Sequence, residues 1–430
     1  MPDWVLVFIA LFAAIGIGVP IPMAIGLATM LGLYFVDISI ITLAQSSFAA
    51  LNNVPIMAVP LFVFAGALME RGGLADRLVA FAQSLVGNYR GALGVVAVLA
   101  CMFFAAISGS GPATAAAVGG VMLPAMARER YPAAFSGAVI ASAGALGSLI
   151  PPSNLMVFYG IVASASIPQL FLAGVVPGIL AGFLMMVTVW LIARRRGYGD
   201  MTAAVSLARV RRTAWDAKWA LLAPVVILGG IYGGAFTPSE AAAVAVFYAI
   251  GTGVFVYRQL TWRKFVESLR VTSLISGAIV VMIGPAIAFG QLAALMQIPE
   301  QINALLGGFA ESPLAVLLIV AGVLIVTGTF MESIAQIILF TPLFLPLALK
   351  VGIDPIALGV VIVLTCEIGF LTPPVGANLF VAMRLARVGL GPVSIAVLPF
   401  LGVYVAVVLL VAWLPQLALW LPRMMQAMGR

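Results

Sequence analysis

Long apolar runs, separated by short polar breaks, recur along nearly the whole chain, from Trp4 to Leu421. A helix of about 17 to 25 apolar residues is long enough to cross a hydrocarbon core about 30 Å thick. Most of the runs reach this length, and each of these predicts a membrane-spanning helix. We therefore expect an all-α polytopic membrane protein with about 10 crossings.

Composition excludes a water-soluble domain. Of the 430 residues, 64% are hydrophobic and only 8% are charged. Soluble domains carry about 25% charged residues, so a lipid bilayer is the environment that this composition fits.

One polar segment near the middle of the chain, at 194–218, is strongly basic. Its cationic residues are Arg194, Arg195, Arg196, Arg209, Arg211, Arg212 and Lys218. Because cytoplasmic loops are enriched in Lys and Arg, we place this segment in the cytoplasm. It holds much of the positive charge behind the net charge of +7. That charge therefore indicates membrane topology, and we expect no nucleic-acid partner.

The two sides of the basic loop resemble each other. The motif IPPSNLMVF at 150–158 recurs loosely as TPPVGANLF at 372–380. Three pairs of prolines have the same spacing of 222 residues: Pro124 and Pro346, Pro151 and Pro373, and Pro177 and Pro399. Weak internal repeats of this kind are typical of secondary transporters.

This spacing predicts two repeats, 1–193 and 219–430, joined by the cytoplasmic loop. Counting apolar runs outward from that loop gives about five crossings in each half. An odd number of crossings per repeat gives the two halves opposite orientations in the membrane. We therefore predict two inverted-topology repeats.

Each predicted repeat contains two interrupted segments. We expect re-entrant hairpins at 91–127 and 313–349, and discontinuous helices at 133–167 and 354–383. Gly and Pro break these helices at membrane depth, where unpaired peptide groups are tolerated only inside protein or beside water. Matched breaks in two halves favour a substrate and ion site at the bilayer midplane over simple packing.

The tip of the first hairpin reads SGSGPATAAAVGG, 108–120. Its freed carbonyls and the hydroxyls of Ser108, Ser110 and Thr114 are hard oxygen ligands that suit an alkali cation. Taken alone, the motif fits a close-packed helix crossing of small residues equally well. The candidate cation and substrate ligands at all four breaks are Ser108, Gly109, Ser110, Thr114, Pro151, Pro152, Asn154, Thr327, Gly328, Thr329, Glu332, Thr372, Pro373, Pro374, Gly376 and Asn378.

Three acidic residues lie in apolar regions, where an ionised carboxylate is expensive. Glu332, beside the second hairpin tip, is the strongest single candidate for a cation ligand. Glu240 follows Thr-Pro-Ser and fits a helix-capping position at least as well. Glu367 precedes the second double proline, and its role as a protonated, paired or cation-binding group stays open.

Enzyme chemistry and a transition-metal site are disfavoured. The chain has no histidine and two cysteines, Cys101 and Cys366, both inside apolar segments. It lacks an HExxH or GxSxG arrangement, so an intramembrane enzyme would have neither metal cluster nor activated nucleophile. A pure assembly scaffold is also disfavoured because it gives no reason for two matched breaks at membrane depth.

Several segments together resemble the large membrane subunit of the tripartite ATP-independent periplasmic (TRAP) transporters. They are SGSGPATAAAVGG, LIPPSNLMVFYG, FLAGVVPGIL, GGAFTPSEAAAVAV, GTFMES with ILFTPLFLPLA, GIDPIALGV and GFLTPPVGANLF, in the order of that family. The resemblance spans essentially the whole chain.

This resemblance implies a multi-pass protein of the bacterial inner membrane, with an elevator mechanism in which a transport domain moves against a scaffold domain. It also implies sodium as the coupling ion, with no other cofactor. The implied partners are a small four-helix membrane subunit and a periplasmic solute-binding protein. By position, Ser108, Ser110 and Glu332 match the family's sodium regions, whereas Glu367 replaces a neutral polar residue such as Asn.

The function that we expect is sodium-coupled uptake of a small organic anion, a carboxylate such as a dicarboxylate. No Arg or Lys in the membrane core is evidently placed for such an anion, so we assign its recognition to half-helix amino termini and to Asn154, Thr372 and Asn378. The alternative is a stand-alone inverted-repeat sodium/anion symporter or ion exchanger that needs no delivery protein.

Overall fold

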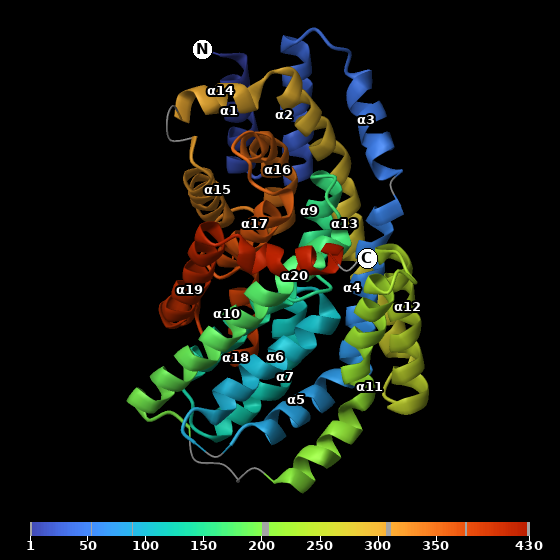
Figure 1. The fold of residues 1–430 in the computed structure, drawn as a ribbon, viewed down its shortest axis with the longest axis vertical. Coiled ribbons are helices and arrows are strands. Elements are labelled where there is room, and N and C mark those ends of the chain that lie inside the picture. The colour runs from blue at the N-terminus through green and yellow to red at the C-terminus, as the bar shows by residue number, and fades with distance from the viewer. Residues whose placement is uncertain are drawn as a thin grey trace.

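Helices and short connections make up the chain in the computed structural model, which describes residues 2–52, 54–87, 89–199, 206–306, 311–374 and 376–427. No strand occurs among the residues that it describes, which confirms the all-α prediction. Figure 1 shows an elongated bundle of helices, with α1, α2 and α14 toward the upper end and α5, α10 and α11 reaching the lower end.

The first half of the chain contains ten α-helices and two short 3₁₀ helices among the described residues. They are α1 (Asp3–Gly16), α2 (Ile21–Phe35), α3 (Ile41–Leu51), η1 (Val54–Met57), α4 (Ala58–Arg71), α5 (Leu74–Leu85), α6 (Ala92–Ser108), α7 (Gly111–Arg128), α8 (Ala133–Gly144), η2 (Ala145–Ser148), α9 (Asn154–Val162) and α10 (Ile167–Arg196).

The second half begins within the basic region. Its helices are α11 (Leu207–Tyr232), α12 (Pro238–Gly251), η3 (Thr252–Val256), α13 (Trp262–Leu295), α14 (Ile298–Leu306), α15 (Pro313–Gly328), α16 (Ser333–Lys350), α17 (Pro355–Phe370), α18 (Ala377–Ala386), α19 (Leu390–Trp413) and α20 (Gln416–Ala427).

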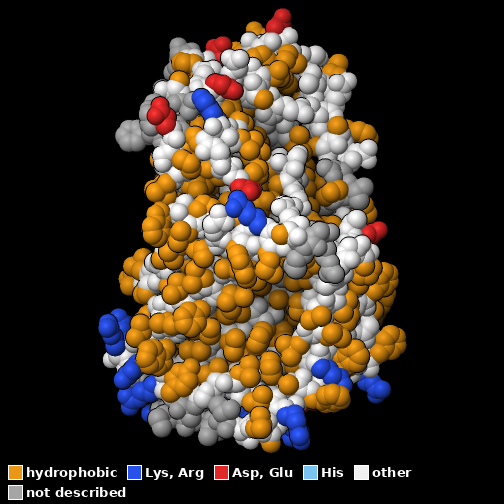
Figure 2. Space-filling model, viewed as in Figure 1, with side chains coloured by type: hydrophobic (Ala, Val, Ile, Leu, Met, Phe, Trp, Pro, Cys, Tyr) orange, Lys and Arg blue, Asp and Glu red, His pale blue; other side chains and the backbone are white. Residues whose placement is uncertain are grey.

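The bundle has a broad apolar surface on the face that Figure 2 shows. Figure 2 shows hydrophobic side chains over its middle, while many Lys and Arg side chains gather at the lower end. Within the described residues, six helices are long and apolar enough to span a membrane unaided: α10, α11, α12 with η3, α13, α16 and α19. The remaining apolar helices have 10–17 residues. Because a helix rises 1.5 Å per residue, these reach full membrane thickness only in combination.

Helix boundaries repeat with the spacing of the prolines. Helix α7 spans Gly111–Arg128 and α16 spans Ser333–Lys350. The first residues of the two helices, and likewise their last residues, are therefore as far apart in the sequence as the paired prolines. The helical stretch Ala133–Ser148 and helix α17, Pro355–Phe370, have the same offset. In Figure 1, α6 and α7 lie in the lower half of the bundle, and α15 and α16 in the upper half. The opposite orientation of the two halves stays a prediction.

Both double prolines interrupt helical structure. Helical structure stops at Ser148 and resumes at Asn154, and it stops at Phe370 and resumes at Ala377. The Pro151–Pro152 and Pro373–Pro374 peptide bonds are both cis. Helix α4 packs on α12 and α13 and also contacts α6 and α9, so it lies beside the first hairpin and the first interruption.

Candidate functional site

The first hairpin tip is bound to the first helix interruption. Gly109 ends α6 with a φ of +65°, a left-handed conformation that glycine adopts without strain. Its carbonyl accepts a hydrogen bond from the backbone N–H of Asn154 at 3.0 Å. The N–H of Gly111 donates to the hydroxyl of Ser148, also at 3.0 Å. These bonds satisfy peptide groups that would otherwise be unpaired at membrane depth.

Small residues allow this contact. A Cβ added at Gly147 would lie 2.5 Å from the carbonyl oxygen of Ser110, and one at Gly144 would lie 3.0 Å from the backbone nitrogen of Ala115. The hydroxyls of Ser108 and Thr114 are hydrogen-bonded to each other at 2.6 Å. The small-residue packing and the predicted oxygen ligands therefore coexist in one motif, although the sequence presented them as alternatives.

The second hairpin tip is built differently. Glu332 is the N-cap of α16, and its Oε2 accepts from the N–H groups of Ile334 at 2.9 Å and Ala335 at 3.3 Å. The equivalent position of the first half, Ser110, is the N-cap of α7, where its side chain forms no capping bond. A carboxylate thus occupies in the second half the place that a hydroxyl occupies in the first.

The second tip also packs tightly on its own helix interruption. A Cβ added at Gly328 would lie 2.9 Å from the Cα of Gly369, and the converse distance is the same. The hydroxyl of Ser333 donates to the carbonyl of Cys366 at 3.3 Å. Gly369 follows Gly147 by the same spacing that relates the prolines, so the glycine on the interruption side is equivalent in the two halves. Its partner on the hairpin is not equivalent, because Gly147 meets Ser110 whereas Gly369 meets Gly328.

Glu367 connects the two halves. It is fully buried, and its Oε2 accepts from the side-chain amide of Asn378 at 3.5 Å. A Cβ added at Gly111, in the first hairpin, would lie 3.2 Å from the same oxygen. The other carboxyl oxygen, Oε1, has no hydrogen-bond partner among the described residues, and neither have Oδ1 of Asn378 and Oδ1 of Asn154. Buried oxygens without partners carry an energetic cost that a bound cation or a proton would relieve.

A cavity of about 360 Å³ lies where the first tip faces α4 and α13. Five of the predicted site residues line it: Ser108, Gly109, Ser110, Asn154 and Glu332. Helix α4 touches the tip directly, because a Cβ added at Gly66 would lie 3.1 Å from the carbonyl oxygen of Ser108. The cavity therefore has one wall from the hairpin tips and interruptions, and another from α4 and α13.

Other predicted residues lie outside this cavity lining. The hydroxyls of Thr327, Thr329 and Thr372 donate to carbonyls near the ends of α15 and α17. The remaining ones are Thr114, Gly328, Gly376, Asn378 and the four prolines Pro151, Pro152, Pro373 and Pro374. Glu240 forms a capping box with Thr237, in which each residue accepts a bond from the other's backbone N–H. Glu240 therefore caps α12, the structural role that fits its position in the sequence.

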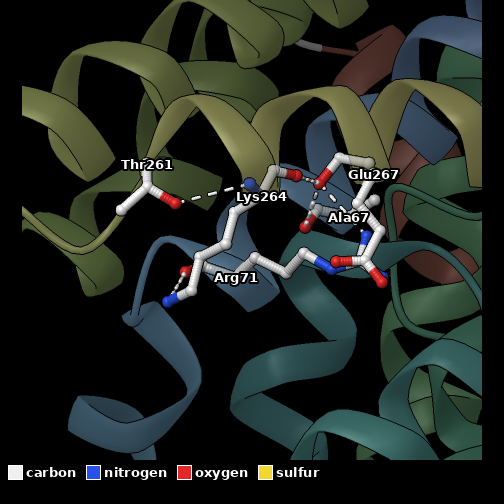
Figure 3. Close-up of polar contacts among 6 residues, drawn as sticks. Ala67, Arg71, Thr261, Lys264 and Glu267 are labelled. Carbon is white, nitrogen blue, oxygen red and sulfur yellow. Dashed lines mark hydrogen bonds and ion pairs between the residues drawn. The ribbon is translucent and has the colours of Figure 1, made fainter.

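Arg71 and Gln336 were missed by the sequence reasoning. Arg71, the last residue of α4, lines the cavity but is not among the candidate site residues of the sequence. Figure 3 shows its side chain reaching toward Glu267 of α13. Gln336 is buried behind the second tip and donates to Thr327 Oγ1 at 2.8 Å and to the carbonyl of Leu324 at 2.7 Å. Gln336 could have been recognised as a candidate from the sequence, because it is a polar residue inside an apolar helix.

Comparison with known proteins identifies the family. The family model described as tripartite ATP-independent periplasmic transporter, DctM component, matches residues 6–417. A C4-dicarboxylate TRAP transporter large permease protein of Pseudomonas aeruginosa is 42% identical over 390 residues, which are 91% of each chain. The sialic acid TRAP transporter large permease protein of Vibrio cholerae is 38% identical, over 90% of each chain.

Two further likenesses differ in extent. The isethionate TRAP transporter permease protein of Oleidesulfovibrio alaskensis is 41% identical over 95% of this chain, which spans only 64% of that relative's length. The crystal structure of the Alcanivorax borkumensis YdaH transporter matches with a TM-score of 0.59 at 16% identity, over 88% of this chain and 87% of that one. This second likeness shows the fold alone. The chain belongs to the tripartite ATP-independent periplasmic transporters, as a large, multi-pass permease subunit of the inner membrane.

Proposed function

We propose that this permease subunit takes up a small organic anion by sodium-coupled secondary transport. The observation that carries the proposal is the cavity between the first hairpin tip and α4 with α13, since its lining combines Asn154, whose Oδ1 has no hydrogen-bond partner among the described residues, with the acidic Glu332 and the cationic Arg71. The relatives support the substrate class, because their names refer to C4-dicarboxylate, sialic acid and isethionate, all of them organic anions.

Sodium coupling is supported by the chemistry of the two tips. Hydroxyl, carbonyl and carboxylate oxygens are the ligands that hard cations prefer. Glu332 contributes a carboxylate to the cavity, and Ser108 and Ser110 contribute hydroxyls. A cation bound beside Glu332 would offset its negative charge and allow an anion to enter the same space.

An elevator movement would use the two walls of the cavity differently. In this proposal α4 and α13 belong to the scaffold, while the hairpins and interrupted helices move as one body with the substrate. The close glycine contacts within each hairpin and interruption support a rigid moving body. Alternating access by rigid-body movement of one part against another is general among transporters built from repeats.

We also propose the two partners that the tripartite family implies, a small membrane subunit and a periplasmic solute-binding protein. The isethionate relative has chain beyond the part that matches this protein, which supports an additional membrane component. The binding protein would deliver the substrate.

The test is uptake into proteoliposomes of a panel of labelled organic acids under an inward sodium gradient. Each partner is added or omitted in turn, and a potassium gradient replaces sodium as the control. Uptake that needs sodium and both partners is expected. Uptake by this chain alone would favour the stand-alone symporter, and uptake without sodium would contradict the coupling ion.

A further inference from the structure

Arg71 is the one Lys or Arg among the described residues that line the cavity. The other ionisable side chains of the lining that can carry charge are those of Glu70 and Glu332, both acidic. An organic anion entering this space therefore meets a single cationic side chain. Arg71 is the last residue of α4, on the wall of the cavity that faces the hairpin tips.

The backbone of Arg71 is held independently of its guanidinium group. Lys264 of α13 donates from Nζ to the carbonyl oxygen of Arg71 at 3.2 Å, and the hydroxyl of Ser268 lies 3.3 Å from the carbonyl oxygen of Ala67. Figure 3 shows these contacts between α4 and α13. The end of α4 is thus fixed by contacts that a change of the Arg71 side chain does not remove.

The guanidinium group itself is weakly engaged. Nη1 donates to the hydroxyl of Ser268 at 3.2 Å, and Nη2 lies 3.9 Å from Oε1 of Glu267, whose side chain is 58% exposed. An exposed ion pair at this distance contributes little. A guanidinium has five N–H donors, so most of its capacity to bind a carboxylate remains.

We infer that Arg71 binds the substrate, exchanging its pair with Glu267 for a carboxylate of the organic anion in the cavity. The inference rests on the proposed function and adds a named contact on the α4 wall. A carboxylate inside the cavity is less solvated than that of Glu267, so its charge-assisted bonds to the guanidinium are stronger. Glu70, the neighbouring carboxylate, repels the same anion and limits where it can bind.

The experiment compares four variants in the proteoliposome assay with both partners, measuring KM and maximal rate. Arg71→Gln is expected to raise KM about 10- to 100-fold, the usual effect of losing a hydrogen bond between charged groups. Arg71→Lys keeps the charge but loses the bidentate fork, so its KM should lie between those of Arg71→Gln and the wild type. Glu267→Gln, the matched control, should leave KM within about twofold, and Glu70→Gln should lower it.

A second readout separates binding from a purely structural role. Competition by a dicarboxylate and by its neutral diamide is measured for the wild type and for Arg71→Gln. The wild type should prefer the acid, and the variant should lose most of that preference. Equal effects of Arg71→Gln and Glu267→Gln on maximal rate, with KM unchanged, would show that Arg71 only clamps α4 to α13.

If the wild type takes up no organic anion, the proposed function and this inference are both wrong. If it does and Arg71→Gln keeps its KM, only this inference is wrong.

Discussion

Gly328 and Gly369 approach each other so closely that a Cβ on either would lie 2.9 Å from the Cα of the other. The pair joins the end of α15 to the second helix interruption. Gly147, the equivalent of Gly369 in the first half, also lies close to backbone, but its partner is Ser110, which is the equivalent of Glu332. The spacing that relates the prolines therefore relates the interruption glycines Gly147 and Gly369, while each hairpin meets its glycine at a different position.

The first prediction follows from this contact. Gly369→Ala forces the second tip and its interruption apart, and such overpacking costs about 1–3 kcal/mol. We expect a lower thermal unfolding midpoint in detergent and slower uptake. Gly322→Ala, on α15 where no atom lies within 4 Å of an added Cβ, is the control and should unfold at or above the wild-type temperature, because Ala favours a helix over Gly. Equal unfolding midpoints of the two variants would contradict the assigned packing.

The second prediction separates two roles of Glu332. Glu332→Ala removes both the proposed cation ligand and the cap of α16, and loss of a cap costs about 1 kcal/mol. Glu332→Ser restores a capping hydroxyl but not the charge. Both variants should need more sodium for half-maximal uptake, while only Glu332→Ala should be less stable to heat. Unchanged sodium activation in both would remove Glu332 from the proposed site.

The third prediction concerns the hydroxyls of the first tip. Ser110 makes no capping bond with its side chain, whereas the hydroxyl of Ser108 is bonded to Thr114 at 2.6 Å. Ser110→Ala should therefore reduce sodium affinity only modestly, since the backbone carbonyls remain, and should leave the unfolding temperature unchanged. Ser108→Ala should lower that temperature by the equivalent of about 1 kcal/mol. The reverse order of stabilities would show that the hydroxyl contacts are wrongly assigned.

The fourth prediction concerns Glu367. This carboxyl is fully buried, and one of its oxygens has no hydrogen-bond partner among the described residues. Glu367→Gln keeps its shape and removes a charge that is costly at membrane depth, so its unfolding midpoint in sodium-free buffer should equal or exceed that of the wild type. Glu367→Ala leaves a cavity beside Asn378 and should lower the midpoint by the equivalent of about 2 kcal/mol or more. If Gln destabilises as much as Ala, the ionised carboxylate itself is needed for folding.

Local sequence determined the membrane character, the helical class, the helix interruptions and the spacing of the repeat. Each of these depends on features that neighbouring residues carry by themselves. Apolar length selects a membrane helix, and Gly or Pro at 108–112, 151–152 and 373–374 interrupts it. The capping position of Glu240 is similarly local, because its partner Thr237 is three residues away. The family was recognisable for the same reason, since its motifs are continuous segments.

The tertiary structure alone decided which distant residues share the site. It brings Glu367 of the second half against Gly111 of the first, and it places Arg71 in the lining of the cavity. It also shows that Asn154 and Glu332 line the cavity while Thr372 and Asn378 do not. Hydropathy has no information on these contacts, because it registers how apolar a segment is and not which face of a helix meets another. Packing between helices far apart in the chain sets those directions, and the site exists only once that packing is complete.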